Sequence, residues 1–112
     1  MNQSRLNAYR IMWLFVSFDL PVVTKTEKKI ASGFRKKLLI DGFSMMQYSI
    51  YVRHCASKES MDVHINRVKG FVPEKGHVTI MGITDKQYGN IINIWGKKTK
   101  PLKIVPIQME MF

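Results

Sequence analysis

The chain has 112 residues, 46% of them hydrophobic, and its 18 Lys and Arg against 8 Asp and Glu give a formal net charge of +10. This length suits one domain with one core, and the hydrophobic content excludes a disordered chain. The charge excess attracts polyanions, so nucleic acid is the first partner to consider and an anionic membrane the second, with a merely solubilising surface as the plain alternative. Cys55 is the single cysteine, which rules out an internal disulfide and fits a reducing cytoplasm.

Residues 1–9 are polar and predict a flexible N-terminal extension. Ile11 to Phe18 is an apolar run broken only by Ser17, which is typical of a strand covered on both faces. The run is far shorter than the ~20 residues that span a bilayer. We therefore expect a cytoplasmic protein without a membrane partner.

The next predicted element is a helix that begins after Thr24, whose spacing to Glu27 matches a capping box. Gly42 is the natural C-terminal stop of this helix. An apolar stripe at helical spacing consists of Ile30, Ala31, Phe34 and Leu38. The opposite face is basic and carries Lys25, Lys28, Lys29, Arg35, Lys36 and Lys37.

Hydrophobic periodicity and capping signals also define the elements that follow. These elements are strands over residues 43–53, 77–83, 91–95 and 102–111, a helix from Ser57 that ends by Pro73, and a capped helical turn at residues 84–87. Prolines in the last strand place it at a sheet edge.

The order of the elements predicts an α+β fold, a ferredoxin-like βαββαβ sandwich with an antiparallel sheet and both helices on one face. The core domain spans residues 10–96, and residues 97–112 form a C-terminal segment with an edge strand. Two helices cover only one sheet face, yet the strands are apolar on both. Since an exposed apolar sheet would aggregate, we expect a second copy on the uncovered face and hence a homodimer.

Asp19 directly follows the first strand, where the sheet holds the backbone and the carboxylate stays exposed. This hard oxygen ligand suits Mg²⁺ or another divalent metal, which takes one or two carboxylates together with water and substrate phosphates. A two-fold axis would supply a second carboxylate for phosphodiester cleavage. The alternative is that Asp19 only fixes the turn into Leu20 and Pro21 by bonding nearby amides.

The basic helix face predicts a ridge that follows a phosphate backbone without reading bases, and Arg53 of the second strand is counted with it. A solvated face is the alternative, but no acidic residues lie opposite the ridge. The histidines lack metal-ligand spacing with Cys55, so a surface or packing role is expected for each. They are His54, His64 and His77.

Four stretches occur in an order and spacing that are specific to one family. They are Phe18-Asp19-Leu20-Pro21, Thr24 to Lys29, Met46 to Arg53, and Ile83 to Tyr88. These stretches resemble the CRISPR-associated Cas-two proteins, the small subunits of spacer acquisition. The last of them is similar to the type II branch, as are Asn66-Arg67 and Gly76-His77-Val78. The similarity covers about residues 10–96, most of the chain.

The resemblance implies a ferredoxin-like homodimer whose C-terminal strand reaches the partner's sheet. Its ends would hold subunits of the CRISPR integrase, and its basic surface would carry double-stranded prespacer DNA. Many members also cleave RNA or DNA with Mg²⁺ held by two symmetry-related aspartates, here Asp19, with Phe18 and Tyr51 at supporting aromatic positions. Nuclease-active relatives can carry an arginine two residues before the Gln-Tyr-Ser segment, where this chain has Met45.

We therefore expect a homodimeric DNA-binding scaffold that bridges integrase subunits during spacer acquisition, and leave Mg²⁺-dependent endonuclease activity at Asp19 open. The alternative is a stand-alone, toxin-like, metal-dependent endoribonuclease of the same fold that acts without an integrase partner. A plain RNA-binding module is a third hypothesis.

Overall fold

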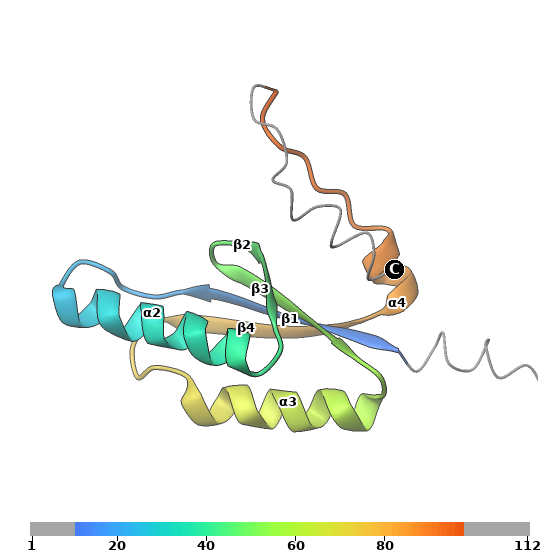
Figure 1. The fold of residues 1–112 in the computed structure, drawn as a ribbon, viewed down its shortest axis with the longest axis horizontal. Helices are drawn as coiled ribbons and strands as arrows, with labels where there is room; N and C mark the ends of the chain where they lie inside the picture. Colours follow the sequence, from blue (N-terminus) through green and yellow to red (C-terminus); the bar gives the residue numbers. More distant parts are fainter. Residues whose placement is uncertain (1–10, 98–112) are drawn as a thin grey trace, which may run out of the picture.

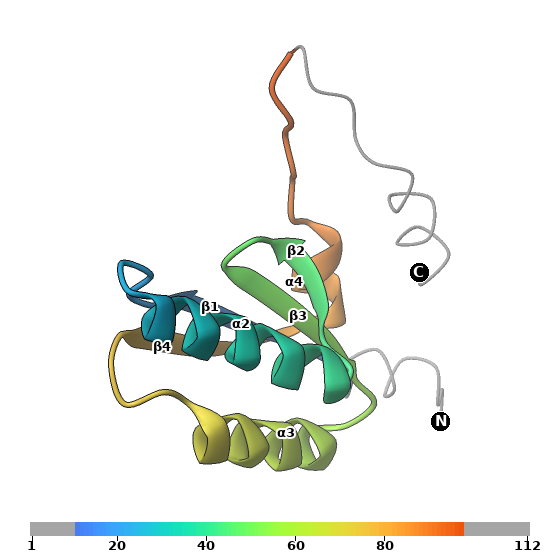
Figure 2. The same ribbon diagram turned by 60° about the vertical axis from the view of Figure 1, so that its left-hand side comes forward.

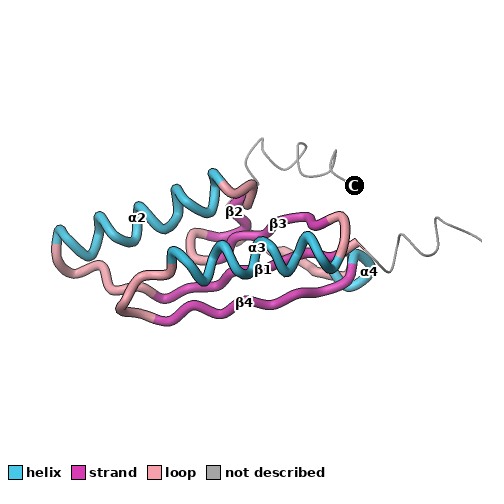
Figure 3. Tube along the Cα trace, turned by 90° about the horizontal axis from the view of Figure 1, so that it is seen from below, coloured by secondary structure: helices cyan, strands magenta, loops and turns pink. Residues whose placement is uncertain are grey.

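The computed structural model describes residues 11–97. In chain order its elements are β1 (Met12–Asp19), α2 (Lys25–Ile40), β2 (Ser44–Gln47), β3 (Ile50–Cys55), α3 (Lys58–Phe71), β4 (His77–Thr84) and α4 (Asp85–Gly89). The strands form one antiparallel sheet in the order β2-β3-β1-β4. Helices α2 and α3 run along one face of this sheet (Figures 1 and 3). The predicted ferredoxin-like βαββαβ sandwich is confirmed.

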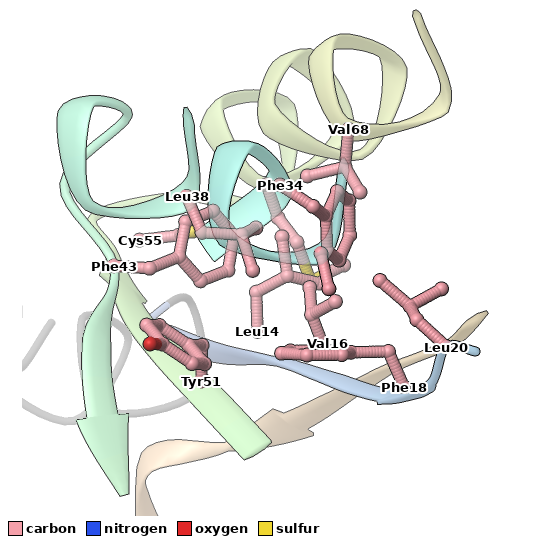
Figure 4. Close-up of a cluster of buried hydrophobic side chains, with 12 residues drawn as sticks. Leu14, Val16, Phe18, Leu20, Phe34, Leu38, Phe43, Tyr51, Cys55 and Val68 are labelled. Atoms are coloured by element: carbon pink, nitrogen blue, oxygen red, sulfur yellow. The ribbon is translucent and has the colours of Figure 1, made fainter. Parts of the chain in front are cut away.

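Strand β1 lies inside the sheet, and its side chains alternate between the two faces. The even-numbered side chains from Leu14 to Phe18 pack under the helices in the main core (Figure 4). The odd-numbered Trp13 and Phe15 form a smaller buried cluster with Val52 on the opposite face, which we call the open face. The apolar run therefore serves two cores, and each fully buried side chain of this size stabilises the fold by ~1.5–3 kcal/mol.

Helix α2 begins and ends where its sequence predicts. The Glu27 amide donates to the Thr24 hydroxyl oxygen, and the Glu27 carboxylate accepts from the Thr24 amide, both at 3.0 Å. Gly42, with a φ of 92°, ends the helical path. One member of the predicted apolar stripe, Ile30, is 48% exposed, whereas the other three are buried. Ile30 lies at the margin of the apolar arc, where contact with the sheet is lost.

The single strand predicted over residues 43–53 is wrong, because β2 and β3 are the two arms of a hairpin that turns at Tyr48 and Ser49. The alternation of apolar and polar residues continues through this turn, and no Asn-Gly or Asp-Gly pair marks it. Periodicity alone therefore could not show the reversal. The Phe18 amide donates to the Ser49 carbonyl at 3.0 Å, which places the hairpin turn beside the end of β1.

The C-terminal predictions are confirmed only in part. The third predicted strand and the capped turn are β4 and α4, but residues 91–95 are not a strand. This segment runs away from the sheet (Figure 2), and in residues 11–97 it has no neighbouring strand with which to form a ladder. The predicted strand at 102–111, the extension at 1–9 and all but the first residue of the segment 97–112 lie outside the described residues. No helix within 11–97 combines the length and apolarity that a membrane crossing needs.

A polar cluster joins the end of α2 to α3, and in it the side chains of Asp41 and His64 are buried whereas that of Arg67 is exposed. The Asp41 carboxylate accepts hydrogen bonds from His64 Nδ1 at 2.7 Å and from Arg67 at 3.0 Å. Burial alone would raise the pKa of the Asp41 carboxyl, but the hydrogen bonds from His64 and Arg67 outweigh it and hold the pKa below its ordinary value. The ionised form of Asp41 therefore stabilises the packing of the two helices.

Replacing Asp41 with Ala should lower the free energy of unfolding by ~2–3 kcal/mol at neutral pH, because the buried His64 ring loses its partner. The folded-state pKa of Asp41 lies below its ordinary 3.8, so this stabilisation is complete above that value and is lost as the pH falls through the folded-state pKa. The deficit of the variant should therefore shrink below about pH 4, which urea unfolding at neutral and acidic pH would measure.

The matched control is Asp62→Ala, which removes an exposed carboxylate from α3 and should change the free energy of unfolding by less than ~0.5 kcal/mol. Equal deficits for Asp41→Ala at both pH values would show that the ionised carboxylate is not the stabilising group.

Candidate metal site and nucleic-acid interface

Asp19 is the last residue of β1, and its side chain is exposed. Its two neighbours are buried: Phe18 is 5% exposed and Leu20 is 9% exposed. The Phe18 ring packs edge-on against Phe34, with 5.0 Å between ring centroids, and lies 5.7 Å from the Tyr51 ring. Phe18 and Tyr51, the residues predicted to support Asp19, therefore pack together in the core on the helix side of the sheet (Figure 4).

Gly76 packs closely against the backbone at Asp19. Its φ is 101°, and a Cβ at this position would lie 2.8 Å from the Asp19 carbonyl oxygen and 2.7 Å from a methyl group of Leu20. Glycine adopts this conformation without steric cost. The close approach holds the start of β4 against the end of β1, where Asp19 and His77 are partners in the ladder. Sequence reasoning missed the placement of His77 beside Asp19.

The Asp19 carboxylate makes no hydrogen bond or ion pair with any residue from 11 to 97, so the turn-fixing bonds of the alternative reading are not formed. Within the same residues, no group of three or more His, Cys, Asp and Glu lies within reach of one metal ion. Within these residues Asp19 is therefore a single carboxylate, and a single carboxylate holds a metal of the Mg²⁺ type only where water, substrate phosphates or further ligands complete the shell.

The outer side of α2 is exposed and basic. Four of its lysines fall within an arc of roughly 100° opposite the buried stripe, given 3.6 residues per turn. We call this set the basic ridge, and it consists of Lys25, Lys28, Lys29 and Lys36. None of the four forms an ion pair with a described residue. Lys37 lies outside this arc, on the side of α2 toward α3, with its ammonium 5.9 Å from the centre of the Phe71 ring. Free ammonium groups in this arrangement suit a phosphate backbone.

Two of the residues predicted to bind nucleic acid, Arg35 and Arg53, form hydrogen bonds with other parts of this chain. The Arg35 guanidinium lies 3.8 Å from the centre of the Tyr48 ring, and its Nε donates to the Tyr48 carbonyl at 3.2 Å. Arg53 donates to the Asp41 carbonyl at 2.7 Å, at the C-terminal end of α2. Arg35 thus contacts the hairpin turn, whereas Arg53 is bonded to the end of a helix. Their binding of nucleic acid stays a prediction.

The candidate site lies on the surface and not in a deep cavity. A hollow of about 720 Å³ opens between the start of α2 and the end of α3, and Asp19 is not among the residues that line it. Neither the basic ridge nor the Asp19 carboxylate encloses a small molecule. The basic ridge is an open surface of the kind that suits an extended polyanion.

Residues 12–91 match the family model of CRISPR associated protein Cas2. The chain belongs to this family. It is 51% identical over 109 residues to the CRISPR-associated endoribonuclease Cas2 of Flavobacterium psychrophilum, with 97% of this chain and 95% of the relative covered. It is 48% identical over 101 residues to the protein of the same name from Parvibaculum lavamentivorans, covering 90% of this chain and all of the relative. Family membership in Cas2 confirms the resemblance found in the sequence.

In this Cas2-family chain, replacing Gly76 with Ala should lower the free energy of unfolding by ~1–3 kcal/mol. The physical reason is that alanine tolerates a φ of 101° only under strain and that its Cβ would meet the Asp19 carbonyl oxygen. Gly70→Ala in α3 is the matched control, since nothing lies within 4 Å of the added Cβ. The control should be neutral or stabilise by up to ~1 kcal/mol. Urea unfolding compares the two, and a Gly76→Ala variant as stable as wild type would contradict the tight approach.

Proposed function

We propose that this protein is a homodimeric, DNA-binding scaffold of CRISPR adaptation, which carries double-stranded prespacer DNA along α2 and bridges subunits of the CRISPR integrase. The observation that supports this proposal is the separation of two surfaces. The basic ridge lies on the outer side of the helix layer, and the open face lies on the far side of the sheet. One surface binds a polyanion without reading bases, while the other stays available to a second copy.

The open face is covered at one end only, and the part that stays exposed supports the proposal that a second copy packs there. Tyr88 of α4 stacks on Trp13 with 3.7 Å between ring centroids, so α4 covers one end of this face. Met81, which lies opposite Phe15 in the ladder, is 53% exposed. Strand β4 is an edge strand of eight residues, and such an edge pairs readily with a strand of another chain. The C-terminal strand expected at residues 102–111 is the segment we propose for this pairing.

A second activity is favoured by the exposed, unpaired carboxylate of Asp19 in the described structure and by the endoribonuclease names of the relatives. We infer metal-dependent cleavage of RNA at this position, with Asp19 and its copy in the second protomer as metal ligands. A bound Mg²⁺ would stabilise negative charge on the phosphate and activate a water. If the protein cleaves RNA in this way and has no integrase partner, it is the stand-alone endoribonuclease of the alternative hypothesis.

Replacing Lys28, Lys29 and Lys36 with Gln should weaken the binding of duplex DNA. The slope of log K against log salt should fall by ~2.7, since each phosphate contact contributes ~0.9. Asp19→Asn should leave binding unchanged and abolish metal-dependent cleavage of RNA. Fluorescence anisotropy at several salt concentrations measures the first effect, and an oligonucleotide cleavage assay with Mg²⁺ measures the second.

The matched control replaces three exposed lysines away from α2 with Gln: Lys58, Lys69 and Lys86. Equal weakening by both triple variants would mean that net charge, and not the basic ridge, binds the duplex. Loss of spacer acquisition in cells by Asp19→Asn with intact DNA binding would overturn the scaffold and favour the ribonuclease.

Introducing a charge on the open face should separate the dimer. We expect Met81→Glu to raise the dissociation constant of the dimer by at least about a hundredfold, because an unpaired carboxylate would be buried between the sheets. Ile40→Glu on α2 is the control, because Ile40 is 85% exposed on the helix side. Analytical ultracentrifugation measures both variants. A wild-type protein that is monomeric at micromolar concentration would refute the dimer.

A further inference from the structure

Asp19 and His77 lie directly opposite each other in the antiparallel ladder of β1 and β4. Partners of this kind project from the same sheet face, with Cβ atoms ~4.5–5.5 Å apart. The same ladder pairs Trp13 with Ile83, and both of these side chains belong to the cluster on the open face. Because side chains alternate along a strand and the register is unbroken, Asp19 and His77 also project from the open face.

His77 differs from the other two histidines, His54 and His64, whose rings contact other side chains of the described structure. His64 is bonded to Asp41 at 2.7 Å, and His54 packs edge-on against Trp13 with 5.1 Å between ring centroids. His77 is exposed and has no hydrogen bond, ion pair or ring contact within residues 11–97. Its two ring nitrogens are therefore available beside a carboxylate that is equally unpaired.

We propose that His77 is a second ligand, beside Asp19, for a divalent metal, and that its nitrogen shifts the preference of the site from Mg²⁺ toward Mn²⁺. This inference rests on the metal-dependent activity proposed above for Asp19. Mg²⁺ is bound mainly through oxygen and gives up its water reluctantly, whereas imidazole suits first-row transition metals. One carboxylate and one imidazole from each protomer still leave coordination positions open for water and for phosphate oxygens.

The backbone around the pair favours ligation because it is held rigidly. Both residues belong to hydrogen-bonded strands, and elements of this kind position ligands more exactly than loops do. Gly76 precedes His77 and packs on the Asp19 carbonyl. The separation of the two side chains is therefore set before any metal binds.

Metal affinity tests this inference independently of cleavage. Mn²⁺ is titrated into the full-length protein, free Mn²⁺ is followed by electron paramagnetic resonance, and Mg²⁺ affinity is obtained by competition. His77→Ala should weaken Mn²⁺ binding at least about tenfold and Mg²⁺ binding less than about twofold. His77→Gln, which offers an amide oxygen in place of nitrogen, should lose the Mn²⁺ preference and keep Mg²⁺ binding. Asp19→Asn should abolish both.

The matched control is His54→Ala, which removes another exposed histidine of the sheet. His54 is paired with Trp13 and Asp19 with His77, so this control should leave both affinities unchanged. If Asp19→Asn removes Mn²⁺ binding and His77→Ala leaves it intact, the inference about His77 is overturned while the metal at Asp19 stands. If neither variant alters Mn²⁺ binding, the proposed metal site itself fails. Equal losses of Mn²⁺ and Mg²⁺ in His77→Ala would refute the selectivity.

Discussion

The register between β1 and β4 is the constraint on which both faces of this molecule depend. Eight consecutive pairs join the two strands, from Met12 with Thr84 to Asp19 with His77. Gly76 packs on Asp19 at one end, and at the other the Trp13 indole donates to Asp85 at 2.7 Å. A slip of one residue would turn the whole apolar set of a strand to the wrong face. The two ends together exclude that slip.

The fixed register also determines what each side of the sheet can do. Side chains that point toward the helices are fully committed to the core, so the helix layer presents its lysines outward. The cluster of Asp41, His64 and Arg67 fixes α3 against the C-terminal end of α2, and the stacking of Arg35 on Tyr48 ties α2 to the hairpin. Lysines on a helix held in this way keep a constant spacing, which favours a regular phosphate backbone over a flexible ligand.

Much of this fold could be predicted because its signals are local. The capping box at Thr24, the positive-φ stop at Gly42 and the apolar run of β1 each depend on a few adjacent residues. The hairpin turn escaped prediction because it carries no turn signal. The contact between Arg35 and Tyr48 was not predicted, because the two residues meet only when α2 packs on the hairpin.

The proximity of His77 to Asp19 illustrates a signal that sequence reasoning could have used. Spacing along the chain, which served to dismiss the histidines as ligands, says nothing about residues from different strands. Asp19 directly follows one predicted strand and His77 begins another. In a ferredoxin-like sheet these strands are antiparallel neighbours, so the end of one lies beside the start of the other. Topology, once predicted, was enough to bring the two residues together.

The distribution of charge bears on whether two copies with a formal charge of +10 each can associate. Sheets that pack face to face lie ~10 Å apart, and a helix with its side chains adds ~10 Å on each side. The basic ridges of two copies packed through the open face would therefore lie about 30 Å apart, several times the screening length of ~8 Å at physiological ionic strength. Repulsion between the ridges would then cost the dimer little. The same arrangement leaves both ridges on outer surfaces, where one duplex or two can reach them without disturbing the interface.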